Sequence, residues 1–192
     1  MNPRIQIYNT HHLNSKRNRS LFFRLSLKLC IFQVFEILKT GMSNRRAARE
    51  SALKSIYAVE VGKSRTQDVT KNIIKAELKD DTESVKFAEK LLLVTVDNAH
   101  EYDEIIQNHI NNWKVERLAM LDKLILRMAI SEFLYFEDIP TKVTINEAIE
   151  LAKDYSTRKS GNFVNGILDA VLGQFKQEGK IKKSGRGLIE TS

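Results

Sequence analysis

Cysteine, proline and glycine are scarce in this chain of 192 residues, and each scarcity restricts what the chain can form. The one cysteine, Cys30, lies in the leading segment, so an intramolecular disulfide and a thiolate metal site are both excluded. This usage fits a reducing, cytoplasmic setting, which we expect for the protein. There are only two prolines and eight glycines, most of them near the ends, so helices can run uninterrupted through the middle.

Catalytic motifs are missing too. The chain has no G-x-x-x-x-G-K-[ST] phosphate loop, no G-x-G-x-x-G fingerprint and no G-x-S-x-G nucleophile elbow. After Met42 the only histidines are His100 and His109. Their spacing on one expected helix points them to nearly opposite sides, so they cannot share a metal ion. We therefore expect no cofactor, no metal and no enzymatic activity.

Positive charge is concentrated at the start of the chain. Residues 1–41 carry seven basic residues and one acid, hence +6 of the total of +7, which leaves +1 for the rest. A nucleic-acid surface on the rest must therefore come from local clustering of basic residues.

The leading segment, residues 1–41, has three interpretations. It is apolar from Leu21 to Leu38 but interrupted by Arg24, Lys28 and Glu36, unlike a signal peptide or a membrane span. The composition changes at Met42, which favours a true start there; a real targeting segment and an added amphipathic helix are the alternatives.

The stretch from Val115 to Phe136 is expected as one long helix around which the others pack. It is apolar around most of its circumference, which is typical of a helix surrounded by others. Pro140 follows its end. A thin polar seam runs along it, made of Asp122, Lys123, Arg127, Ser131 and Glu132.

Helical periodicity predicts further helices on both sides of this one. We expect them at Arg45–Val61, Gln67–Leu78, Glu83–Ala99, His100–Ile110, Thr141–Asp154 and Asn162–Phe175. The prediction is an all-α fold of six to seven helices in two packed sub-bundles, about residues 42–112 and 113–175. The polar, basic tail at 176–192 is expected to be disordered.

Two features indicate a binding surface. Arg45, Arg46 and Arg49 cluster at the start of a helix, where positive charge opposes the helix dipole unless an anion sits on it. A short basic loop, residues 156–161, lies between Tyr155 and Phe163. Arginines neutralise phosphates and aromatic rings stack on unpaired bases. From the residues alone, binding of single-stranded RNA and a helical protein-interaction module fit equally, and the arginines could instead form a solvated basic face.

Several separated strings resemble the NusB family of transcription antitermination factors. They are RRAARE at 45–50, DKLILR at 122–127, Ile139-Pro140, VTINEAIELAK at 143–153 and FVNGILD at 163–169. The resemblance covers about residues 43–175 in the family's order. It implies two small helical bundles and a non-catalytic protein that binds the boxA element of ribosomal RNA leader transcripts together with NusE, a ribosomal protein. It further implies an antitermination complex with RNA polymerase and other Nus factors.

The resemblance also implies roles for single residues. It places RNA phosphate contacts at Arg45, Arg46 and Arg49, and adds Tyr57 to the same surface. It implies base stacking at Tyr155 and Phe163. Lys159 lies in a loop that departs from the family pattern and is a weaker RNA candidate. For NusE, the candidates are Asp122, Arg127 and Glu132 of the polar seam, with helix–helix ion pairs as the alternative for each.

Two other functions remain open at this stage. One is a protein-interaction or homodimeric module without sequence-specific RNA binding, because family members can form homodimers. The other is an RNA-modifying enzyme, because NusB-like domains also occur fused to ribosomal RNA methyltransferases. The absence of a cofactor-binding region in the chain disfavours the second.

Overall fold

The computed structural model describes residues 44–79, 81–110 and 114–190, and this part of the chain is helical without any strand. The all-α prediction is therefore confirmed. In chain order the elements are α2 (Asn44–Glu60), α3 (Thr66–Val69), the π-helical turn η1 (Thr70–Ile74), α4 (Lys75–Leu78), α5 (Thr82–Asp97), α6 (Ala99–His109), η2 (Val115–Arg117), α7 (Met120–Tyr135), α8 (Thr141–Tyr155), α9 (Ser160–Gln177) and η3 (Gly185–Glu190). The expectations for residues 1–41 and for the start at Met42 lie outside the described residues.

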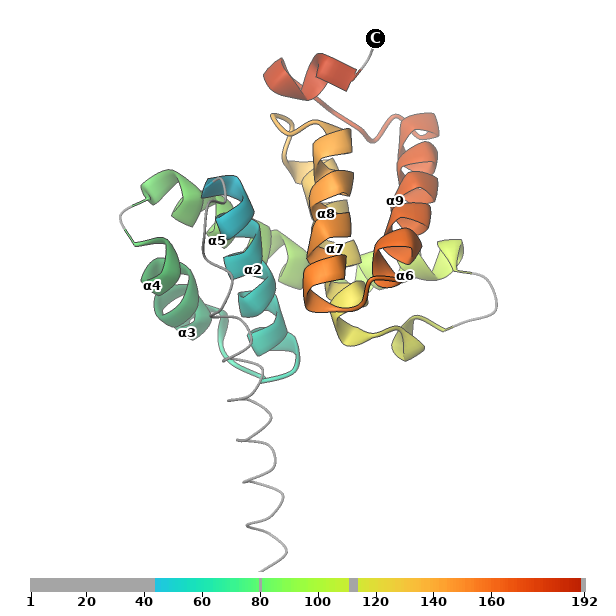
Figure 1. Cartoon of the computed structure of the whole chain (residues 1–192). Coiled ribbons are helices and arrows are strands. Elements are labelled where there is room, and N and C mark those ends of the chain that lie inside the picture. Colours follow the sequence, from blue (N-terminus) through green and yellow to red (C-terminus); the bar gives the residue numbers. More distant parts are fainter. Residues whose placement is uncertain (1–43, 80, 111–113, 191–192) are drawn as a thin grey trace, which may run out of the picture. The chain divides into compact units, whose positions relative to one another are not determined.

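The helices form two groups that meet along α7 (Figure 1). In the first group α2 packs on α5, and the continuous run from α3 through α4 packs against α2. In the second group α8 and α9 pack on each other and on α7. None of the helices in the described ranges is long and apolar enough to cross a membrane.

The boundary between the groups differs from the sequence-based expectation. Helix α6 contacts α7 and α9, so it belongs to the second group, although the predicted division lay just before Val115. The chain turns between α5 and α6 at Asn98, whose backbone leaves helical geometry at φ −107° and ψ 18°. Beyond that turn α6 buries Tyr102 and Ile106 completely.

The prediction of one helix over Val115–Phe136 is wrong at its start. A 3₁₀ turn covers Val115–Arg117, and Leu118 and Ala119 are extended, with ψ values of 148° and 132°. The amide of Val115 donates to Gln107 Oε1 at 2.9 Å, which ties this segment to α6. The helix α7 therefore begins only at Met120.

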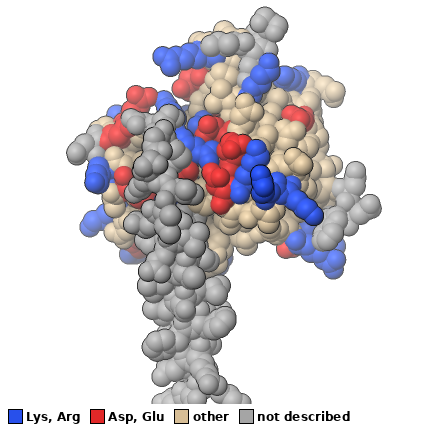
Figure 2. All heavy atoms as spheres, in the orientation of Figure 1, with Lys and Arg blue, Asp and Glu red and all other residues tan. Residues whose placement is uncertain are grey.

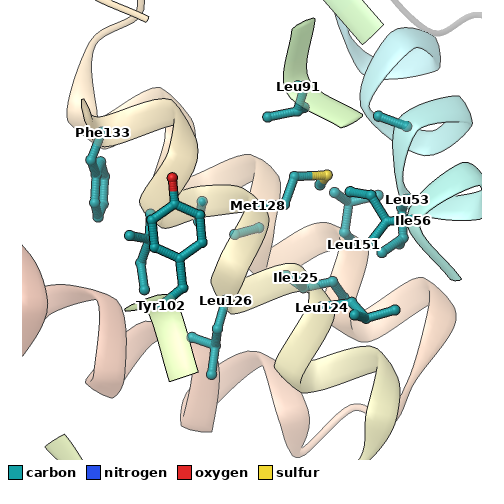
Figure 3. Packing of buried hydrophobic residues seen from close by; sticks show 14 of the residues in the cluster. Leu53, Ile56, Leu91, Tyr102, Leu124, Ile125, Leu126, Met128, Phe133 and Leu151 are labelled. Carbon is teal, nitrogen blue, oxygen red and sulfur yellow. The ribbon is translucent and has the colours of Figure 1, made fainter. Parts of the chain in front are cut away.

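The central position of α7 is confirmed. It contacts α2, α5, α6, α8 and α9. Its residues Leu124, Ile125 and Leu126 are fully buried. In Figure 3 Ile125, Leu124 and Met128 lie towards Leu53 and Ile56 of α2 and Leu151 of α8, whereas Leu126 lies on the side of Tyr102 of α6. One hydrophobic cluster thus spans both groups of helices.

The described part of the tail packs against the helices, in contrast to the predicted disorder. Lys183 Nζ donates to the backbone oxygens of Phe136, at 2.8 Å, and Glu132, at 3.3 Å, which lie at the C-terminal end of α7. The amide of Ser184 donates to Glu137 O at 3.0 Å. Gly187 is buried so close to Glu137 O that a Cβ there would lie 2.1 Å from it. These contacts fix the tail over the α7–α8 corner.

Candidate nucleic-acid interface

The first arginine of α2, Arg45, is the accessible one. Its side chain is 38% exposed and pairs with Glu83 at 2.6 Å, a glutamate that is itself 79% exposed. The guanidinium also lies 4.6 Å from the centroid of the Phe87 ring. An exposed ion pair contributes little net stability, so Arg45 can exchange Glu83 for another anion at small cost.

The second arginine, Arg46, is held by several acids. Its Nε donates to Glu50 at 3.2 Å, its Nη1 to Glu147 O at 3.3 Å and its Nη2 to Asp154 at 2.8 Å. The whole residue is only 9% exposed. These acids come from α2 and α8, so Arg46 joins the two groups of helices.

The third arginine, Arg49, is buried in a bidentate pair. Its Nε and Nη2 donate to the two carboxylate oxygens of Glu132 at 2.6 and 2.9 Å. Thr144 Oγ1 donates to the same carboxylate at 3.1 Å. Burial opposes the charged guanidinium, but the carboxylate of Glu132 outweighs it and raises the pKa of Arg49 above its ordinary value.

These positions change the meaning of the arginine cluster. Positive charge at the start of α2 opposes the helix dipole unless anions lie nearby. For Arg46 and Arg49 these anions are carboxylates of the protein itself, from Glu132, Glu147 and Asp154. For Arg46 and Arg49 the structure therefore supports neither a solvated basic face nor free phosphate contacts. The sequence gives no signal for these pairs, because their partners lie more than 80 residues further along the chain.

The loop between α8 and α9 is close to its expected form. Arg158 and Lys159 are exposed, and Tyr155 and Phe163 flank them half-buried. Burial, followed by the nearby carboxylate of Glu50, raises the pKa of Tyr155 well above its ordinary value. Tyr155 thus links the loop to the acids around Arg46. Tyr57, the remaining aromatic candidate, is half-buried on α2 against the core.

Phe163 borders an open pocket of about 340 Å³ between α6, η2, α7 and α9. Asp122 lies in the wall of this pocket and is 8% exposed. Its Oδ2 accepts a hydrogen bond from Ser160 Oγ at 3.0 Å, whereas its Oδ1 has no hydrogen-bond partner.

The polar seam of α7 faces inward. Arg127 donates from Nε and Nη2 to the carboxylate of Asp103 at 2.6 and 2.5 Å, and its Nη1 lies 3.5 Å from Glu60. Arg127 and Glu132 are 4% and 2% exposed. For these two residues the alternative of helix–helix ion pairs is confirmed. A direct contact of their side chains with a partner does not fit this burial.

The surface around these residues carries both signs of charge. Figure 2 shows acidic side chains gathered on the face between α2 and α8, with basic side chains bordering them. Glu147 and Asp154 of α8 pair with Arg46 of α2 at 3.4 and 2.8 Å, and Lys153 pairs with Glu150 within α8 at 2.6 Å. Among the predicted site residues, the partly exposed Arg45 and the exposed Lys159 offer positive charge to a polyanion, and the exposed Arg158 adjoins Lys159.

The described residues thus form a helical bundle whose central helix α7 is enclosed by two groups of helices, with a basic loop flanked by aromatic residues between α8 and α9. The NusB family model matches residues 46–173, and the chain belongs to the NusB family.

Two bacterial relatives are similar over most of this region. The transcription antitermination protein NusB of Salinibacter ruber is 44% identical over 148 residues, which cover 77% of this chain and 92% of the relative. The protein of the same name from Chloroherpeton thalassium is 45% identical over 147 residues, 77% of this chain and 70% of the relative.

Solved structures agree with the fold. NusB of T. maritima superposes with a TM-score of 0.60 at 34% identity, covering 71% of this chain and 94% of that one. A structure of antitermination factors NusB and NusE in complex with dsRNA matches with a TM-score of 0.63, covering 70% of this chain and 99% of that one. Its identity of 24% supports the fold alone.

Proposed function

We propose that this protein is a transcription antitermination factor that binds boxA RNA of ribosomal RNA leader transcripts together with NusE. The observation that carries the proposal is the 44% identity with an antitermination protein over nearly its whole length. The chain also shares the fold of a NusB chain that was solved with NusE and dsRNA. In this role the protein acts in the cytoplasm, in a complex with RNA polymerase and other Nus factors, and performs no catalysis.

We assign the RNA contacts to accessible groups first. Arg45, Lys159 and the neighbouring Arg158 supply positive charge to phosphates, and Phe163 and Tyr155 offer ring surface to unpaired bases. Arg46 and Arg49 act indirectly, because their ion pairs hold α2 against α7 and α8 and so place Arg45. Tyr57 contributes to the same helix from its half-buried position.

For NusE, the seam residues keep an indirect role. Arg127 holds α6 through Asp103 and α2 through Glu60, so it shapes the surface that these helices present. Asp122 orients the loop before α9 through Ser160. Glu132 anchors Arg49. A homodimer that covers the RNA surface is the second candidate function, suggested by the family resemblance.

A transcription assay tests the proposal. A template with boxA ahead of a terminator is transcribed by RNA polymerase with the other Nus factors, with and without this protein. We expect the protein to raise read-through on this template and not on one with a scrambled boxA. Equal read-through on both templates would contradict the proposal.

A further inference from the structure

The pocket beside Phe163 combines an apolar lining with a buried carboxylate, that of Asp122. We call it the α6–α9 pocket; its walls include Arg117, Leu118, Ala119, Asp122, Phe163 and Ile167. Most of its lining is apolar, with one buried carboxylate, one arginine and the ring of His109, whose Nδ1 is hydrogen-bonded to Ile105 O at 2.8 Å. A planar, mostly apolar ligand that carries a few hydrogen-bond donors fits such a lining.

Asp122 has one carboxylate oxygen hydrogen-bonded and the other without a hydrogen-bond partner. Ser160 Oγ donates to Oδ2 and is itself connected to Thr157 Oγ1 at 2.9 Å and to Ser156 Oγ at 3.1 Å. Oδ1 is buried without a donor. A buried acceptor without a partner costs free energy, and a ligand that brings an N–H group recovers it. The site is therefore built to receive a donor.

The charges around the pocket identify the kind of ligand. Arg117 lies in the wall, and Arg158 and Lys159 immediately precede Ser160, which bonds to Asp122. A cationic side chain from a partner protein would be repelled by these groups. A nucleotide satisfies both demands, since its phosphate meets Arg117 in the wall while its base brings donors to the carboxylate.

We infer that the α6–α9 pocket binds one unpaired RNA base that carries an exocyclic amino group, with Asp122 as the residue that selects it. The inference rests on the proposed RNA-binding function. Adenine, cytosine and guanine each present an amino group to a carboxylate acceptor. Uracil has none, and the carbonyl oxygens on both sides of its N–H are repelled by the carboxylate. Phe163 supplies the ring beside the base.

The test compares fluorescently labelled C12 and U12 RNA on the full chain by anisotropy. We expect C12 to bind about tenfold more tightly than U12, the order of one good base contact. Asp122→Asn keeps the size of the side chain but adds an N–H donor that can meet a uracil oxygen. In this variant U12 gains and the preference falls towards one.

A second variant guards against a folding effect. Ala119 is exposed and lines the pocket, so Ala119→Phe fills the pocket without entering the core. We expect it to remove the preference for C12 at unchanged thermal stability. Met120→Phe is the matched control, because Met120 is 37% exposed and does not line the pocket; it keeps the preference.

The outcomes distinguish a failure of the base pocket from a failure of the proposed RNA binding. Tight, salt-dependent binding with the same C12 to U12 ratio in the parent, Asp122→Asn and Ala119→Phe proteins overturns the base pocket alone. No binding of any RNA overturns the proposed function, and the pocket inference with it. If Asp122→Asn instead weakens binding of an arginine hexapeptide and leaves RNA unaffected, the pocket receives a protein cation and the inference is wrong.

Discussion

At the scale of single residues, the buried pair of Arg49 and Glu132 decides how α2 is attached. Two charges removed from water must satisfy each other, and here both guanidinium donors meet both carboxylate oxygens. Thr144 adds a third hydrogen bond to the carboxylate. Breaking such a pair leaves an uncompensated charge in the interior, which costs much more than the loss of an exposed pair.

Arg49→Ala should therefore lower the free energy of unfolding by about 3–5 kcal/mol, because it leaves Glu132 buried without a counter-charge. Urea denaturation measures the change. Arg45→Ala is the control: its pair with Glu83 is exposed, so we expect a loss of less than about 1 kcal/mol. Equal losses of unfolding free energy in the two variants would show that the buried Arg49–Glu132 pair stabilises the fold no more than the exposed Arg45–Glu83 pair.

The burial of Tyr155 should make the free energy of unfolding fall at alkaline pH. Burial raises the pKa of its phenol in the folded protein above the ordinary value of about 10. Above pH ~10 the unfolded chain releases this proton while the folded protein retains it, so stability is present below that pH and falls as pH rises beyond it. Tyr155→Phe should flatten this fall, measured as urea midpoints across alkaline pH. Tyr135→Phe, at a tyrosine that is 43% exposed, should leave it unchanged.

For this surface the sequence predicts whether a residue lies in a loop or a helix better than it predicts the residue's tertiary environment. Phe163, Tyr155 and Lys159 lie where a loop-based interpretation places them, because a short polar loop between two helices is necessarily near the surface. Arg46, Arg49 and Glu132 are charged, and charged residues are rarely buried unless they are paired. Their pairing depends on how α2 meets α7 and α8, which local patterns do not encode.

At the scale of elements, the start of α7 differs most from expectation, whereas its end lies at Tyr135, one residue from the predicted end. Periodicity placed its apolar body correctly, because the spacing of buried residues belongs to the helix itself. The break before α7 lies at Leu118 and Ala119, which are extended. Neither residue is a proline or a glycine, so the local sequence does not predict that the helix is interrupted there. The hydrogen bond from Val115 to Gln107 is a tertiary contact that favours the break.

The tail acts as a strap over the other end of α7. Cationic groups near a helix C-terminus interact favourably with its dipole, and Lys183 donates to the carbonyl oxygens of Glu132 and Phe136 there. Lys183→Met should lower the unfolding free energy by roughly 1–2 kcal/mol, read from the thermal midpoint and urea denaturation. Lys182→Met, at an exposed lysine next in sequence, is the control and should be neutral.

Gly187→Ala tests the same strap by its shape. An added methyl group would meet the backbone oxygen of Glu137, which cannot easily move. We expect the tail to detach in this variant, so that amide hydrogens of Ser184 and its neighbours exchange faster. Unchanged exchange at Ser184 would show that the tail is not held at the α7–α8 corner.

At the scale of the whole molecule, net charge is a poor guide and charge placement a better one. The chain after residue 41 carries only +1, and much of its basic charge is already paired with its own acids. RNA affinity therefore depends on where the exposed cations cluster and on stacked rings, and the net charge does not report it. The salt dependence of binding counts such cations, since each phosphate contact adds to the slope.

Lys159→Ala should reduce the slope of log K against log salt by about 0.7, the contribution of one phosphate contact on a single strand. Titrations at several salt concentrations measure it. Lys176→Ala, at an exposed lysine near the end of α9, is the matched control and should leave the slope as it is. Identical slopes for the parent chain and the Lys159 variant would remove Lys159 from the interface.

The most direct test of the account is the affinity of the full chain for boxA RNA and for a scrambled RNA of the same composition, each with and without NusE. We expect boxA RNA to bind more tightly than the scrambled RNA, and NusE to tighten the binding of boxA RNA alone. Equal, weak affinities for the two RNAs that NusE leaves unchanged would contradict it.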